Sequence, residues 1–123
     1  MADRVMTILW MDAARGREEM ALDAFNDSVG LYDRLQEEGR IERVDVTIYS
    51  PNAKIRGCFN LFGTAEQLAD VREDEEFVRL LVEAGMAVDG INVIQGYFNE
   101  GAIGQLGVWT EAIQKVSKAT AAA

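Results

Sequence analysis

Short apolar runs alternate along this chain with longer stretches in which apolar residues recur every three or four positions. In the first run, Val5–Met11, both the odd-numbered and the even-numbered positions are mainly apolar, and charged residues flank the run. This pattern is typical of a strand that is buried on both sides. Between about residues 17 and 36 the apolar positions step by three and four, the period of an amphipathic helix. Glu18 and Glu19 fall in its first turn, where negative charge favours the helix dipole.

Two further strands follow this helix. In Glu42–Ser50 apolar side chains alternate with polar or mixed ones, and Ile55–Gly63 also alternates. Pro51 and Asn52 lie between the two runs and mark a turn. The short connection predicts a β-hairpin.

The second helical stretch begins at a capping signal. Thr64 is followed three residues later by Gln67, the spacing of a capping box. The acidic run at residues 73–76 interrupts the apolar stripe, which then resumes in a new phase. We therefore expect two helical pieces with a break near Asp74 and an end near Gly85.

A fourth strand and a last helix complete the pattern. Ile91–Phe98 reads as the strand, and residues 102–117 as the helix. We expect the small and polar tail, residues 118–123, to fray. The stripe of the last helix consists of Ile103, Leu106, Trp109, Ile113 and Val116.

The element order β-α-β-β-α-β-α predicts an α+β fold of one domain spanning residues 1–123, with its core at residues 4–99. Right-handed crossovers place both main helices on one face of a four-stranded antiparallel sheet, the ferredoxin-like βαββαβ arrangement. A chain of 123 residues is the usual size of a single domain.

The face of the sheet without helices predicts self-association. It carries Tyr49, Cys58 and Phe62, with Ile94 or Trp10 beside them. An apolar face of that extent needs a cover, and a second copy supplies one with two-fold symmetry. The last helix either folds back on its own subunit or docks across the dimer.

The charge and hydropathy of the chain argue against two classes of partner, nucleic acid and membranes. The formal charge is −9 and the 12 basic residues are scattered, which disfavours nucleic acid and anionic membranes. No apolar run approaches the roughly 20 residues that cross a bilayer, and the first segment lacks a small-residue cleavage site. We therefore expect a cytoplasmic protein without a membrane partner.

The chemistry is limited by what the chain lacks. It has no histidine, the commonest general base and metal ligand, and its single cysteine forms no internal disulfide. Gly101, Gly104 and Gly107 do not have the spacing of a dinucleotide site. We expect no metal and no cofactor.

Several motifs resemble the dimeric α/β-barrel superfamily. The run RGREEMALDAF after the first strand resembles the opening of its first helix, and the acidic DEEF break and Gly96-Tyr97 before the final helix resemble a group of uncharacterised small proteins of that fold. The resemblance covers about residues 5–113. It implies a homodimer, and the superfamily includes haem-dependent enzymes, isomerases and cofactor-free monooxygenases. The lack of histidine departs from the haem-binding members.

The resemblance implies a pocket between sheet and helices or inside the dimer barrel. The mixed face of the second and third strands supplies four candidate lining residues, Tyr49, Arg56, Cys58 and Asn60. Trp10 is a fifth, although strand parity does not fix its direction, and Tyr32 on the first helix would close the far side. For Arg56 the alternatives are contact with a ligand carboxylate or phenolate and a cross-strand pair with Asp45. The alternative for the aromatic residues and for Cys58 is that they are simply core.

Three functions remain open at this point, and the residues do not decide whether the chain is an enzyme. The first is binding of a small apolar or aromatic molecule in a sheet-lined pocket. The second is cofactor-independent monooxygenation of a phenolic substrate, in which Asn60, Trp10, Tyr49 and Arg56 would stabilise a substrate anion. The third is a structural or assembly role of the dimer surface.

Overall fold

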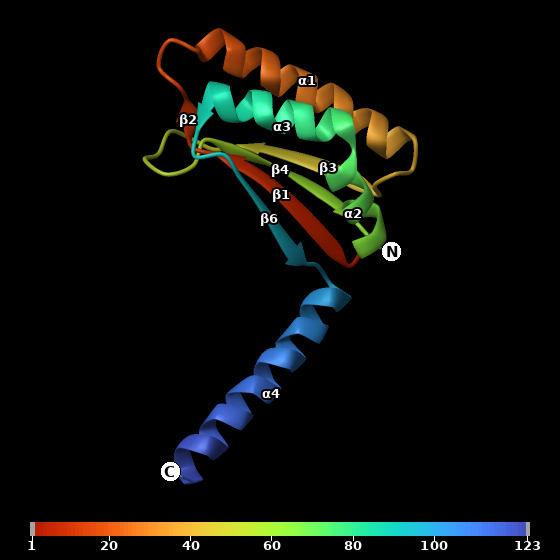
Figure 1. The fold of residues 1–123 in the computed structure, drawn as a ribbon, viewed down its shortest axis with the longest axis vertical. Helices are drawn as coiled ribbons and strands as arrows, with labels where there is room; N and C mark the ends of the chain where they lie inside the picture. Colours follow the sequence, from red (N-terminus) through yellow and green to blue (C-terminus); the bar gives the residue numbers. More distant parts are fainter. Residues whose placement is uncertain (1, 123) are drawn as a thin grey trace.

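The computed structural model describes residues 2–122 as an antiparallel sheet with helices on one face (Figure 1). The sheet order is β3-β4-β1-β6, and each neighbouring pair is antiparallel. This is the predicted ferredoxin-like α+β arrangement. The strands are β1 (Arg4–Trp10), β3 (Arg43–Ile48), β4 (Gly57–Gly63) and β6 (Asn92–Tyr97).

Three helices cover the upper face of the sheet in Figure 1: α1 (Glu18–Glu37), α2 (Ala65–Glu73) and α3 (Glu75–Ala87). The capping box at the start of α2 is present, since Thr64 Oγ1 accepts from the Gln67 N–H and the Gln67 side chain accepts from the Thr64 N–H. The predicted end at Gly85 is wrong by two residues, because α3 continues to Ala87.

The predicted break near Asp74 is confirmed. Its carboxylate accepts hydrogen bonds from the backbone N–H groups of Glu76 and Phe77, at 2.9 and 3.1 Å, and so caps α3. The same side chain pairs with Arg40 at 2.9 Å, which links the break to the loop before β3. An acidic residue here ends one helix and starts the next.

A small second sheet was not predicted. β2 (Asp12–Ala13) pairs with β5 (Val88–Asp89), directly after β1 and α3. Gly90 follows with a φ of +65°, and a Cβ there would collide with the Met11 side chain. The pair closes one end of the space between the sheet and the helices.

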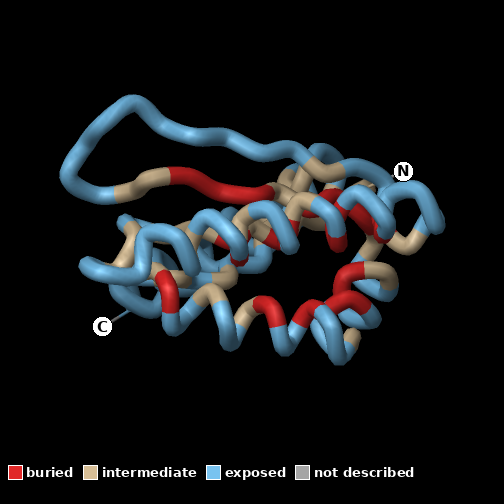
Figure 2. Tube along the Cα trace, turned by 90° about the horizontal axis from the view of Figure 1, so that it is seen from above, coloured by how far each residue is buried: buried red, intermediate tan, exposed pale blue. Residues whose placement is uncertain are grey.

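The core lies between the sheet and α1, α2 and α3. Buried segments (red in Figure 2) line the space between the layers, whereas the outer sides of the helices are exposed. The largest fully buried side chains of the core are Met6, Leu35, Ile41, Leu61 and Val71.

The opposite face of the sheet has no helix over it (Figure 1). Strand register places Thr7 opposite Asn60 and Ile94, and Leu9 opposite Cys58. We call this the open face. It carries Val5, Thr7, Leu9, Tyr49, Cys58, Asn60, Phe62 and Ile94.

The last helix, α4 (Glu100–Ala122), projects away from the rest of the subunit (Figure 1). The alternative that it folds back on its own subunit is therefore wrong for the part of the chain that the structure describes. It starts two residues before the predicted 102, and it continues beyond 117, so the tail expected to fray is helical as far as Ala122. The remaining tail residue, Ala123, lies outside the described residues.

Candidate functional site

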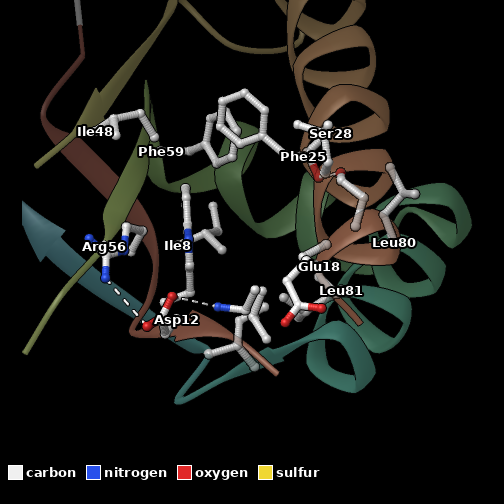
Figure 3. Close-up of a pocket in the computed structure, with 18 of the residues that line it drawn as sticks. Ile8, Asp12, Glu18, Phe25, Ser28, Ile48, Arg56, Phe59, Leu80 and Leu81 are labelled. Carbon is white, nitrogen blue, oxygen red and sulfur yellow. Dashed lines mark hydrogen bonds and ion pairs between the residues drawn. The ribbon is translucent and has the colours of Figure 1, made fainter. Parts of the chain in front are cut away.

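A pocket of about 470 Å³ lies between the sheet, α1 and α3 (Figure 3). Its inner end is formed by buried residues, among them Ile8, Tyr32 and Phe59. Its outer end is bordered by exposed Asp12 and Glu18. The other lining residues are Trp10, Ala13, Ala21, Leu22, Ala24, Phe25, Ser28, Ile48, Arg56, Leu80, Leu81, Ala84, Val88 and Ile91.

Aromatic rings form one wall of this pocket. The Phe59 ring lies 5.7 Å from that of Trp10, 5.2 Å from that of Phe25 and 4.9 Å from that of Tyr32, measured between centroids. Phe59 and Trp10 come from neighbouring strands, and the other two project from α1 seven residues apart, which is two helical turns. Two of these contacts are tilted and the one with Tyr32 is edge-to-face, an arrangement that aromatic pairs favour.

Charged groups are confined to the outer end. Arg56 Nη2 lies 3.3 Å from Asp12 Oδ2, and Figure 3 shows this pair beside the pocket. The Glu18 carboxylate also borders the opening and accepts from the Gly16 N–H at 3.1 Å. The alternative pairing of Arg56 with Asp45 is wrong, because the Asp45 carboxylate pairs with Arg43 on its own strand.

The inner end holds two hydroxyl groups. Ser28 Oγ donates to the Ala24 carbonyl oxygen at 2.8 Å, a local bond within α1. Burial raises the pKa of Tyr32 to about 12, and a hydrogen bond with Ser28 offsets part of that effect. Tyr32 is therefore a neutral phenol at ordinary pH, suited to hydrogen bonding rather than to proton abstraction.

Three other candidate residues lie on the open face, on the far side of the sheet from the pocket. Thr7 Oγ1 donates to Asn60 Oδ1 at 2.6 Å, and Asn60 Nδ2 lies 3.8 Å from Cys58 Sγ. The Tyr49 hydroxyl lies 3.6 Å from the same sulfur. This hydrogen bond, followed by the electrostatic interaction with Cys58, raises the pKa of Tyr49.

The structure therefore divides the six predicted site residues into two groups. Trp10, Tyr32 and Arg56 border the pocket, whereas Tyr49, Cys58 and Asn60 lie on the open face. A single pocket containing all six residues is not formed within one subunit. Whether either group binds a ligand remains a prediction.

Sequence reasoning missed most of the pocket lining. Phe25 lies on the apolar stripe of the first helix and Phe59 on the core side of its strand, so the sequence pattern indicates packing for both. Asp12 and Glu18 carried a weak signal, since each flanks the connection between the first strand and the first helix. Only the approach of α3 to α1 shows that these residues surround a pocket.

Residues 2–122 contain neither a metal-binding cluster nor a membrane-spanning helix. No group of three or more Asp, Glu or Cys side chains is arranged to hold a metal ion there. Within the same residues, no helix is both long and apolar enough to cross a membrane.

Comparison with known proteins identifies solved structures only. No protein-family model matches the chain, and no curated protein does. A dimeric protein of unknown function with a ferredoxin-like fold, from Bacteroides fragilis, superimposes with a TM-score of 0.58 at 13% identity, covering 77% of this chain and 96% of its own.

Two enzymes share the same architecture. SnoaB, a cofactor-independent oxygenase from Streptomyces nogalater, gives a TM-score of 0.53 at 10% identity and covers 80% of this chain and 93% of its own. The hydroxynitrile lyase from Passiflora edulis gives 0.61 at 14% identity and covers 81% and 97%. Identities this low establish the fold and no activity. By its fold, this chain is a ferredoxin-like α+β protein, similar to dimeric proteins of unknown function, as the resemblance to the dimeric α/β-barrel superfamily implied.

Proposed function

We propose that this chain forms a homodimer in which each subunit binds a small apolar or aromatic molecule in the pocket between the sheet, α1 and α3. The observation that carries the proposal is the pocket itself. It is an apolar pocket of about 470 Å³ that is open at its outer end, so a small molecule can reach the buried residues at its inner end. Its size falls within the range of roughly 300–1,000 Å³ that is usual for small-molecule sites.

The distribution of polar groups favours a neutral ligand over an anion. An acidic ligand group at the opening would compete with Asp12 for Arg56 and would face the Glu18 carboxylate. A phenol or ketone avoids that repulsion and still accepts or donates a hydrogen bond. The Arg56 guanidinium is the donor at the outer end, and the Tyr32 hydroxyl is the candidate partner at the inner end.

The ligand class is tested with a matched pair of probes, 1-naphthol and 1-naphthoate. We expect 1-naphthol at ten times its dissociation constant to raise the melting temperature by about 5 °C, since ligand binding to the folded state alone adds roughly 1.4 kcal/mol. The naphthoate should give a much smaller shift. Equal shifts would contradict the charge argument, and no shift with any neutral aromatic probe would contradict the pocket's proposed role.

Two variants locate the binding. Ala84 borders the pocket from α3, so Ala84→Phe should fill the space and abolish the naphthol shift. Val82 lies on the same helix, is 54% exposed and is not a lining residue. Val82→Phe should therefore keep the full shift, and loss of binding in both variants would show that the effect is not specific to the pocket.

A second candidate is cofactor-independent oxygenation of a phenolic substrate. It is favoured by the fold shared with SnoaB and by the presence of Trp10 and Arg56 at the pocket. Asn60 and Tyr49, the other residues considered for that chemistry, lie on the open face instead. Oxygen consumption with a polycyclic phenol above the rate without protein, lost in Ala84→Phe, would favour this candidate over simple binding.

A further inference from the structure

We infer that α4 is an arm that each subunit lays along a second copy of the chain, and that its apolar stripe is buried there. This inference rests on the proposed dimer and adds the surface that completes it. No described residue of α4 is buried in the single subunit. The stripe residues Ile103, Leu106, Trp109, Ile113 and Val116 are 59–70% exposed.

The stripe has a defined direction around the helix. Leu106, Trp109, Ile113 and Val116 follow one another at steps of three, four and three, which places them on one side at 3.6 residues per turn. The charged residues Glu111, Lys115 and Lys118 lie on the opposite side. A helix with one apolar and one charged side is built to bury the apolar side.

The base of α4 is fixed by packing, which sets the direction of the arm. The Phe98 N–H donates to the Asp3 carbonyl oxygen at 2.9 Å, beside the start of β1. Gly101 packs so closely on that carbonyl that a Cβ would collide with it. Asn99, with a φ of 52°, makes the turn between β6 and the helix. The projection of α4 therefore follows from the packed connection to β6.

The arm projects on the side of the sheet opposite α1 and α3, which is the side of the open face (Figure 1). A second copy that covers the open face must therefore lie alongside α4. A helix of 23 residues is about 34 Å long, whereas a packed sheet and a helix layer are each about 10 Å thick. The arm is long enough to pass both layers of a partner, so its whole stripe can be covered.

A matched pair of variants tests this surface. Ile113 belongs to the stripe and is 65% exposed, whereas Val108 is 57% exposed and lies roughly 120° around the helix from the stripe's centre. We expect Ile113→Glu to raise the dimer dissociation constant at least tenfold in sedimentation equilibrium, and Val108→Glu to change it less than twofold. Equal effects, or none, would overturn the assignment of this side of α4.

The environment of Trp109 gives an independent readout. In a Trp10→Phe background it is the remaining tryptophan, because the chain has two. Its emission should shift to the blue in the dimer and return to the red on dilution to monomer. If the protein is a dimer but Trp109 emits in the red, as an exposed tryptophan does, the docking of α4 on the partner is wrong and the dimer proposal remains. If the wild-type protein is a monomer, both the dimer and the docking of α4 are wrong. Naphthol binding in the pocket is tested separately from either result.

The α4 stripe could instead contact a membrane surface or the α4 helix of another subunit, and a separate experiment distinguishes each of these from docking on the partner's body. A blue shift with phosphatidylglycerol–phosphatidylcholine vesicles, without dimerisation, would assign the stripe to a membrane and overturn the inference. Pairing of α4 with another α4 would let Ile113→Cys, in a Cys58→Ser background, form a disulfide between subunits. That result would also overturn docking on the partner's body, and the absence of the disulfide is the result we expect.

Discussion

Tyr32 illustrates how a single residue links the pocket to stability. Burial keeps its phenol protonated in the folded state, with a pKa of about 12 against an ordinary value of 10.0. Between these values the unfolded chain releases this proton and the folded chain retains it. The stabilisation of the folded state by the neutral Tyr32 phenol is therefore fully present below pH 10 and is lost as the pH rises toward 12.

Tyr32→Phe removes that titration. We expect the free energy of unfolding of the variant to fall less steeply between pH 10 and 12 than that of the wild type, by roughly 1–3 kcal/mol over the interval. Urea denaturation at a series of pH values measures it. Parallel pH profiles for the two proteins would show that the Tyr32 hydroxyl is not perturbed by burial.

Strand parity predicted side-chain direction well where one face is polar. In β4 it placed Cys58, Asn60 and Phe62 together, away from Phe59 and Leu61, as the register shows. It was uninformative in β1, where both parities are apolar, so the direction of Trp10 was not predictable. Trp10 packs toward the helices, against Phe25 and Phe59.

Among the helices, the boundary between α2 and α3 depends on Asp74, which is the C-cap of the first and the N-cap of the second. Removal of an N-cap carboxylate leaves backbone N–H groups without their acceptor and typically costs about 1 kcal/mol. We expect Asp74→Ala to destabilise the protein by roughly 1–2 kcal/mol, including the lost contact with Arg40. Asp74→Ser, which keeps a capping oxygen, should recover about half of that loss.

The same residue predicts a pH dependence. The hydrogen bond from the Phe77 N–H, followed by the interactions with Arg40, holds the pKa of Asp74 below its ordinary value of 3.8. Its stabilisation is therefore present above the ordinary pKa and is lost as the pH falls through the lowered value. Denaturation of the wild type and of Asp74→Ala at pH 7 and at pH 2 measures this effect. The difference between their free energies of unfolding should be smaller at pH 2. An equal difference at both pH values would contradict the lowered pKa of Asp74.

Helices and strands with a clear periodicity of apolar residues were predictable from the sequence, whereas the contacts between these elements were not. The break at Asp74 and the cap at Thr64 are local, and both were read from a few residues. The two-residue strands β2 and β5 have no period to read, and they form only because α3 returns to the end of β1. The pocket depends on the same return, which explains why its outer end was not predicted.

At the scale of the molecule, the open face and the pocket lie on opposite sides of one sheet, so association and binding can be tested separately. Ile94 is 47% exposed on the open face, and Val46 is 50% exposed on the opposite side of the same sheet, in register with Phe59. We expect Ile94→Glu to raise the dimer dissociation constant at least tenfold and Val46→Glu to leave it within twofold. Light scattering after size-exclusion chromatography measures both, and a dimer insensitive to Ile94→Glu would exclude the open face as its interface.

Binding in the pocket requires that a neutral aromatic molecule enter the space between the sheet, α1 and α3. Amide chemical-shift mapping by NMR during a titration with 1-naphthol tests it most directly, because it reports where the molecule binds. We expect saturable shifts at Phe25, Phe59 and Leu81, which line the pocket, and none in Ala84→Phe. Shifts confined to α4 or the open face, or no saturable shift at all, would contradict it.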